Sequence, residues 1–141
     1  MRTNLRKNER GAALLETAIT IPIILLIAVS IFEFGRAYQT WQVLTNAARE
    51  GARIAILAEK TDTDVRNAVK NYITSGGLPL GTSVVSIDRN VAVGPNTASR
   101  ITVNYPFQFI VLNPVIRLVT PSSTTGAPLT MQSVALMRNE G

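Results

Sequence analysis

The most informative chemistry in this chain is one acidic residue inside an apolar stretch. Glu16 is the single charged residue between positions 12 and 32. A charged side chain inside a bilayer costs about 2.5–3.5 kcal/mol on insertion scales, so this carboxylate needs a partner or an exit to the interface. Cleavage between Gly11 and Ala12 would create an α-ammonium group, of pKa about 8, four residues before Glu16. We expect Glu16 to pair with that ammonium on a neighbouring subunit; the alternative is that Glu16 reaches the cytoplasmic interface alone.

The composition disfavours most other chemistry. The 141 residues include no Cys and no His, which excludes disulfides, thiolate zinc sites and cysteine or histidine catalysis. There are no carboxylates at catalytic spacing, no glycine-rich phosphate loop and no serine-centred elbow. We therefore expect no enzyme, no metal site and no cofactor. Four of the 14 basic residues lie within positions 1–11, and no basic stripe alternates with aromatic residues, so we expect no nucleic-acid partner.

Residues 12–34 have the length and composition of a membrane span. Seventeen of these 23 residues are hydrophobic. A helix of 21 residues is roughly 31 Å long, close to the thickness of the hydrocarbon layer. Residues 1–11 carry a net charge of +3, which predicts a cytoplasmic N-terminus and an extracytoplasmic remainder. Four aromatic residues then follow within ten positions; we expect them in the outer interface, the alternative being core packing: Phe32, Phe34, Tyr38 and Trp41.

The N-terminus admits three interpretations. A secretory signal could end at residues 28–30, but Glu16 and Pro22 lie inside its apolar region. An uncleaved signal anchor explains the length and the flanking charges, but not the carboxylate. The third interpretation is a type IV prepilin, in which a peptidase cuts after Gly11, at the end of a short basic leader, and leaves the helix in the membrane.

Four segments together resemble the TadE family, the pseudopilins of the tight-adherence (Tad/Flp) pilus. They are residues 11–22, 32–37, 47–53 and, at the C-terminus, 129–140. The resemblance implies a pilin-like fold, processing by a prepilin peptidase, and partners among the other pilins or pseudopilins of the same machine. It also makes local unwinding of the helix around Pro22 in an assembled bundle plausible. Residues 61–128 carry no motif of that family.

Pro22 removes a backbone donor inside the apolar helix. The carbonyl of Ala18 loses its helical partner, and in lipid it must find another donor. The hydroxyl groups of Thr17 and Thr20 are within local reach. We expect a kink near Pro22, or else local melting of the helix in an assembly.

The helix is expected to continue beyond the membrane, over residues 39–58. Small residues recur there at four-residue spacing, at Ala47, Gly51 and Ala55. Such spacing lets another backbone approach closely. The stripe packs either on the protein's own sheet or on a neighbouring subunit. Arg49, Glu50 and Arg53 are expected on a solvated or subunit-facing side.

The remaining residues predict a small α+β head. Thr61-Asp62-Thr63-Asp64 is typical of a helix N-cap rather than a calcium site, and Gly76-Gly77 ends this second helix. Strands are expected over 85–93 and 101–109, around a turn at 94–96, and over 129–138 with a register break near Val134. Pro106 predicts an edge, a bulge or a strand end. Residues 115–119 fit a strand or a short helix.

The sequence thus predicts an α+β, pilin-like protein with a long N-terminal transmembrane helix and a 3–4-stranded antiparallel sheet. The expected parts are a cytoplasmic leader (1–11), a membrane and assembly helix (12–34) and an extracytoplasmic head (35–141). The expected role is that of a TadE-like minor pseudopilin of the cytoplasmic membrane that helps to assemble a pilus for adhesion or secretion. The alternative is an uncleaved membrane anchor that presents a binding module to the cell envelope.

Overall fold

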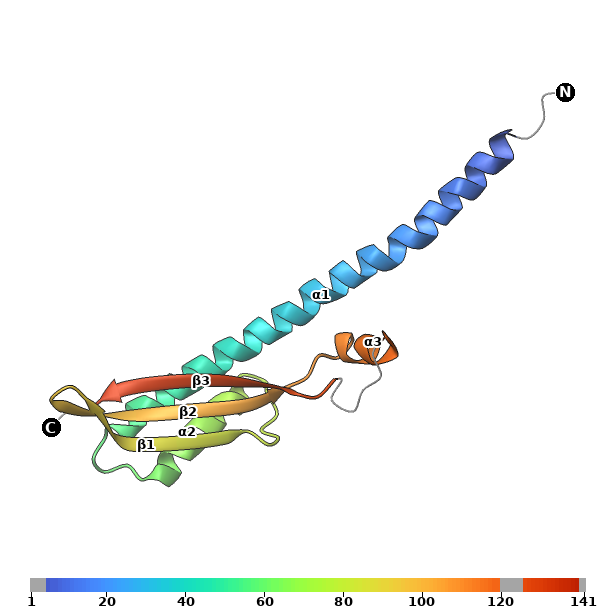
Figure 1. The fold of residues 1–141 in the computed structure, drawn as a ribbon. Coiled ribbons are helices and arrows are strands. Elements are labelled where there is room, and N and C mark those ends of the chain that lie inside the picture. The colour runs from blue at the N-terminus through green and yellow to red at the C-terminus, as the bar shows by residue number, and fades with distance from the viewer. Residues whose placement is uncertain (1–4, 120–125, 140–141) are drawn as a thin grey trace.

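The computed structural model describes residues 5–119 and 126–139, and the side chains of residues 11–118 and 126–139. Its main feature is one long helix, α1 (Leu5–Ala55), which leaves the head and extends far beyond it (Figure 1). Part of the predicted leader, residues 1–4, lies outside the described residues. The expected α+β class, with a long helix and an antiparallel sheet, is confirmed.

The second helix, α2 (Asp62–Ser75), begins where the sequence predicts. Thr61 is its N-cap: the Asp64 amide donates to the Thr61 hydroxyl, and the Asp64 carboxylate accepts from the Thr61 amide at 2.9 Å. This reciprocal pair satisfies two donors that a helix start leaves open. Gly76 ends the helix, and Gly77 follows at a φ of 77° that side-chain-bearing residues rarely adopt. Asp64 thus has a capping role, as predicted.

Three antiparallel strands form the sheet, in the order β1 (Val84–Val93), β2 (Asn96–Phe107) and β3 (Leu129–Arg138). A two-residue turn, Gly94-Pro95, joins the first two strands, and Gly94 has a φ of 57°. The predicted turn at 94–96 is therefore one residue shorter, because Asn96 already pairs with Val93.

The predicted register break near Val134 is wrong. The β2–β3 pairing runs without a shift from Ala98↔Arg138 to Phe107↔Leu129. The irregularity lies instead in β1, between Asp88 and Val91. Pro106 lies one residue before the end of β2, beyond the last residue that pairs with β1, so it removes no bond from that side.

The segment that was ambiguous in the sequence is a helix, α3 (Leu112–Val119), between β2 and β3. Figure 1 shows α3 beside α1, at the end of the sheet that faces the N-terminus.

The core lies between one face of the sheet and the helices α1 and α2. Alternate residues of β2, from Ile101 to Phe107, point into it. Helix α2 contributes Val65, Val69 and Ile73. The outer half of α1 contributes five more buried core residues: Leu44, Ala47, Ala48, Ala52 and Ala55. The head is therefore built on α1 and is not merely attached to it.

One arginine joins three elements at the far end of the head. Arg89 donates to the carbonyl of Ala55 at 2.8 Å, to the carbonyl of Lys60 at 2.9 Å, and to the Asp62 carboxylate at 2.7 Å. These bonds satisfy carbonyls at the end of α1 and just after it. Asp62 thus pairs with Arg89, while Asp64 caps α2.

Candidate functional site

The expected cleavage position lies in a fully exposed part of α1. Residues 11–28 are all exposed. A Cβ atom added to Gly11 would meet no other atom within 4 Å. Gly11 and Ala12 therefore lie in a helical segment that no described side chain covers.

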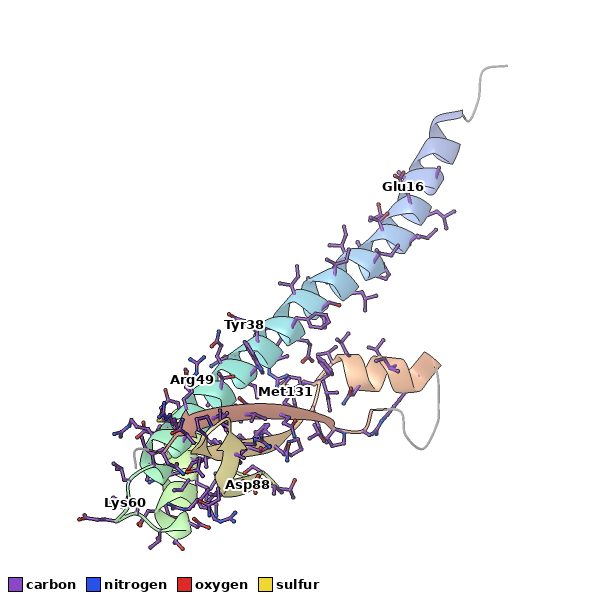
Figure 2. The ribbon with its side chains drawn as sticks, turned by 60° about the vertical axis from the view of Figure 1, so that its left-hand side comes forward. Glu16, Tyr38, Arg49, Lys60, Asp88 and Met131 are labelled. Carbon is purple, nitrogen blue, oxygen red and sulfur yellow. The ribbon has the colours of Figure 1, made fainter. Side chains whose placement is uncertain are left out.

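Glu16 lies one turn after Ala12 and is exposed (Figure 2). Within the described residues its carboxylate makes no hydrogen bond or ion pair. Its backbone carbonyl accepts a hydrogen bond from the Thr20 hydroxyl at 2.7 Å.

The helix continues through Pro22 without interruption. Local melting is not seen in this single chain. The expected use of the threonine hydroxyls is wrong: Thr17 donates to the carbonyl of Ala13 and Thr20 to that of Glu16, so neither serves the Ala18 carbonyl. Each hydroxyl bonds four residues back, which is the usual geometry for threonine in a helix.

None of the described residues covers the apolar part of α1. Among its large side chains, exposed fractions reach 71% at Leu14 and 70% at Ile31. The part of this helix whose side chains are described, Gly11–Ala55, is the one helix among the described residues that is long and apolar enough to cross a membrane. A buried core helix would pass the same test, but the most apolar window of this one is wholly unburied.

A buried carboxylate marks the boundary between the exposed helix and the head. Glu33 has no exposed surface, accepts a 2.8 Å hydrogen bond from Arg36, and accepts a 2.6 Å bond from the backbone amide of Val111. In the sequence, Glu33 and Arg36 are simply two opposite charges at the end of the apolar segment. The amide partner is 78 residues away, and no local pattern could reveal it.

The four aromatic residues near this boundary remain largely exposed. Phe32, Phe34 and Tyr38 have exposed fractions of 61–62%, and Trp41 has 46%, so core packing is not their role. Phe34 makes an edge contact with Phe109 of the head, at 6.2 Å between ring centroids. This exposure is what residues of a membrane interface would show.

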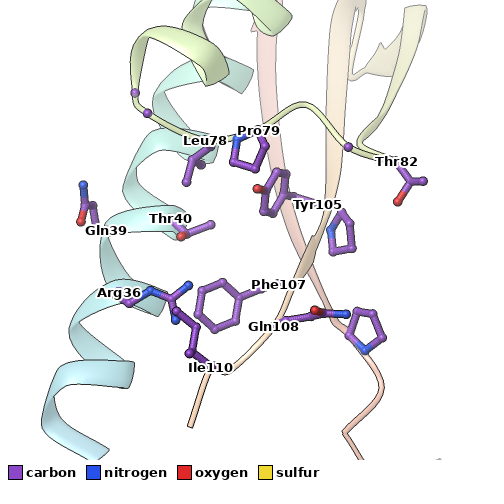
Figure 3. A pocket seen from close by; sticks show the side chains of 15 residues that line it. Arg36, Gln39, Thr40, Leu78, Pro79, Thr82, Tyr105, Phe107, Gln108 and Ile110 are labelled. Carbon is purple, nitrogen blue, oxygen red and sulfur yellow. The ribbon is translucent and has the colours of Figure 1, made fainter. Parts of the chain in front are cut away.

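Just beyond the boundary, a groove of about 720 Å³ lies between α1, the α2–β1 loop and the end of β2 (Figure 3). Arg36, Thr40, Leu78, Tyr105 and Phe107 are among its lining residues. The Arg36 guanidinium lies 5.3 Å from the centre of the Phe107 ring, and burial raises the pKa of the Tyr105 hydroxyl. No group of three or more acidic residues in the described part of the chain could hold a metal ion.

The small-residue stripe packs inside the chain. A Cβ atom added to Gly51 would lie 2.6 Å from a methyl group of Val69 and 3.3 Å from one of Ile101. Ala47 and Ala55 are buried on the same face. The close approach is therefore to α2 and β2 of the same head.

The charged residues of this stretch point away from the core. Arg49 and Arg53 are exposed. Arg53 donates two hydrogen bonds to Glu50, which lower the pKa of the Glu50 carboxyl and raise that of the guanidinium. This pair lies on the surface of the head.

The fold and the site define a class of protein: an exposed, membrane-length N-terminal helix on which a small α+β head is built. Residues 11–53 match the family model described as TadE-like protein. The match begins at Gly11 and ends within the outer half of α1, and it confirms the resemblance over that stretch. Searches of curated proteins and of solved structures found no match. A TadE-like region and an exposed apolar helix fit a membrane protein associated with a Tad pilus.

Proposed function

We propose that this chain is a minor pseudopilin that helps to assemble a Tad/Flp-type pilus. The observation that carries the proposal is the TadE-like match, which starts at the expected cleavage residue and covers the whole exposed apolar segment. The chain would span the cytoplasmic membrane once, with its N-terminus in the cytoplasm and its head outside. Its partners would be a prepilin peptidase and the other pilins or pseudopilins of the machine.

In this proposal, α1 is the element that assembles. Cleavage after Gly11 would place an ammonium group on Ala12, one turn from the exposed carboxylate of Glu16. Because that carboxylate has no partner among the described residues, pairing with a neighbour's ammonium would favour lateral packing of the helices. The charge that is costly in a lone helix would then stabilise the bundle.

The decisive experiment is the N-terminal sequence and intact mass of the protein extracted from membranes that contain a prepilin peptidase. We expect a mature chain that starts at Ala12. Gly11→Val should prevent the cut without disturbing the fold, because that position has open space. Gly35→Val, at a second open helical position, is the matched control and should still be cleaved. A wild-type chain that retains Met1 would support an uncleaved anchor and contradict the proposal.

A further inference from the structure

Within the part of the chain that the structure describes, helix α3 leaves an apolar surface uncovered. Within the helix, Val115, Ile116 and Leu118 have exposed fractions of 38%, 47% and 84%, and just before it Ile110 and Val111 have 60% and 39%. With 100° between successive residues, the three helical positions occupy one broad side. A short segment with this much exposed aliphatic surface marks an interaction site.

The opposite side of α3 is polar and is already used by the head. Asn113 and Arg117 lie one turn apart and both donate to the carbonyl of Gly126, at 3.2 and 3.4 Å. These bonds hold the polar side towards the segment that leads to β3. The apolar side is thereby left facing away from it.

The start of α3 is fixed at the level where the apolar part of α1 ends. The Val111 amide bonds to the buried Glu33 carboxylate, and Phe109 contacts Phe34. Val29 and Ser30, which share a helix face with Glu33, are half-buried, whereas all residues from 11 to 28 are exposed. Figures 1 and 2 both show α3 near the middle of α1, beyond the end of the sheet that lies nearer the N-terminus.

We propose that α3 is a second membrane-contacting element, whose apolar side inserts into the outer interface of the bilayer that α1 crosses. The inference rests on the proposed membrane insertion of α1. Its occupant is lipid because the apolar surface of α3 begins beside that of α1: the Val111 amide bonds to Glu33, which lies between Phe32 and Phe34, and both rings are more than 60% exposed. A short helix with one aliphatic side and one polar side has the composition of an interfacial segment.

Glu33 acts as the positioning residue of this arrangement. Its carboxylate binds the amide that precedes α3 on one oxygen and Arg36 on the other. It thereby sets the depth of α3 relative to the membrane span.

The absence of Cys from the chain makes the test direct, because a single introduced thiol is unique. Three full-length variants would carry an environment-sensitive fluorophore at Leu118→Cys in α3, Ile24→Cys in the span, and Asn71→Cys on the exposed side of α2. Each would be reconstituted at a high lipid-to-protein ratio in phosphatidylethanolamine–phosphatidylglycerol vesicles, with nitroxide lipids as quenchers. We expect shallow nitroxides to quench most of the Leu118 probe, deep nitroxides to quench the Ile24 probe, and neither to quench the Asn71 probe.

The outcomes separate this inference from the proposed function. Quenching at Ile24 with an Asn71-like signal at Leu118 would overturn the role of α3 and leave α1 inserted. No quenching at Ile24 would overturn both. If the Leu118 probe is shielded from the nitroxides, and this shielding disappears as the protein is diluted with lipid, a second copy of the chain covers α3. That result would also overturn the inference.

The role of Glu33 is tested in the Leu118→Cys background. Glu33→Ala should reduce quenching by shallow nitroxides, because α3 loses its anchor. Glu33→Gln keeps an acceptor oxygen for the Val111 amide and should restore most of the signal. Quenching that is unchanged in Glu33→Ala would refute the positioning role, whereas the result at Leu118 in the wild-type background stands on its own.

Discussion

Two acidic residues of α1 illustrate how position decides the use of a carboxylate. Glu33 is buried and bonded within the chain, so its charge is balanced by Arg36 and by a backbone amide. Glu16 is exposed and has no partner among the described residues. The first carboxylate therefore joins α1 to the head, and the second is the one that the proposed function uses between chains.

The proposed assembly role of Glu16 leads to the first prediction. Glu16→Ala should leave the protein in the membrane, because it removes a charge from an apolar span, but should abolish pilus formation. The measurement is electron microscopy of surface pili together with membrane fractionation. Glu59→Ala is the control: it removes an acidic residue from an exposed loop after α1 and should leave piliation intact. Normal piliation in the Glu16→Ala strain would end the assignment.

The second prediction concerns the stability of variants at Gly51. A methyl group there would lie 2.6 Å from a Val69 methyl, and overpacking of this kind costs about 1–3 kcal/mol. The gain in helix propensity, about 1 kcal/mol, offsets part of that cost. Gly51→Ala should therefore destabilise the head, whereas Gly35→Ala, in open space on the same helix, should stabilise the protein slightly.

Thermal unfolding in detergent measures both substitutions. Val69→Ala should cost less stability in the Gly51→Ala background than in wild type, because there it also removes the methyl group that clashes. Equal unfolding temperatures for the two single variants would show that α1 and α2 move apart at no cost.

At the scale of elements, α2 carries a pH-dependent cap. Hydrogen bonds from the Thr61 amide and hydroxyl lower the pKa of the Asp64 carboxyl below its ordinary value of 3.8. A carboxyl whose pKa is lower in the folded state stabilises the protein above its unfolded pKa, and this contribution disappears as the pH falls through the folded value.

The third prediction follows from the lowered pKa of Asp64. Wild-type protein should be more stable than Asp64→Asn at pH 6, and the difference should close as the pH falls below 3.8. Thr61→Ala, which removes the other half of the capping box, should cost about 1 kcal/mol. Chemical unfolding at several pH values measures both. A gap between wild type and Asp64→Asn that widens in acid would contradict the assigned cap.

The elements differ in how far local sequence determines them. The cap of α2, the turn at Gly94 and the strands follow from side-chain types and spacing. Residues 115–119 were ambiguous because so short a segment fits the spacing of apolar residues in a helix as well as that in a strand. The start of α3 is held by a contact between Val111 and Glu33, which lie far apart in the sequence. The sequence also did not predict the bulge in β1, which includes Arg89. The Arg89 side chain binds carbonyls at and just after the end of α1, and this contact exists only in the folded protein.

At the scale of the whole molecule, α1 has two functions with a boundary near Glu33. Before that residue the helix is exposed and apolar; after Thr40 its inner face is the base of the core. Sequence composition predicted the first part, because membrane length and aliphatic content are visible in one segment. It left open whether the stripe at Ala47, Gly51 and Ala55 packs inside or between chains, since small residues at that spacing fit both partners.

The last prediction concerns which fragments of the chain can fold, given the two parts of α1. A fragment of residues 35–141 should fold and stay soluble without detergent, because it keeps every α1 residue of the core and loses the exposed apolar segment. A fragment of residues 56–141 should not fold, because it lacks Leu44, Ala47, Ala48, Ala52 and Ala55. Amide hydrogen exchange measures both.

In the 35–141 fragment, protection should persist in α2 and the sheet but fall in α3, because the Val111 amide has lost its Glu33 acceptor. Full protection of α3 in that fragment would show that the head holds α3 by itself, and a folded 56–141 fragment would show that α1 is an appendage rather than the base of the core.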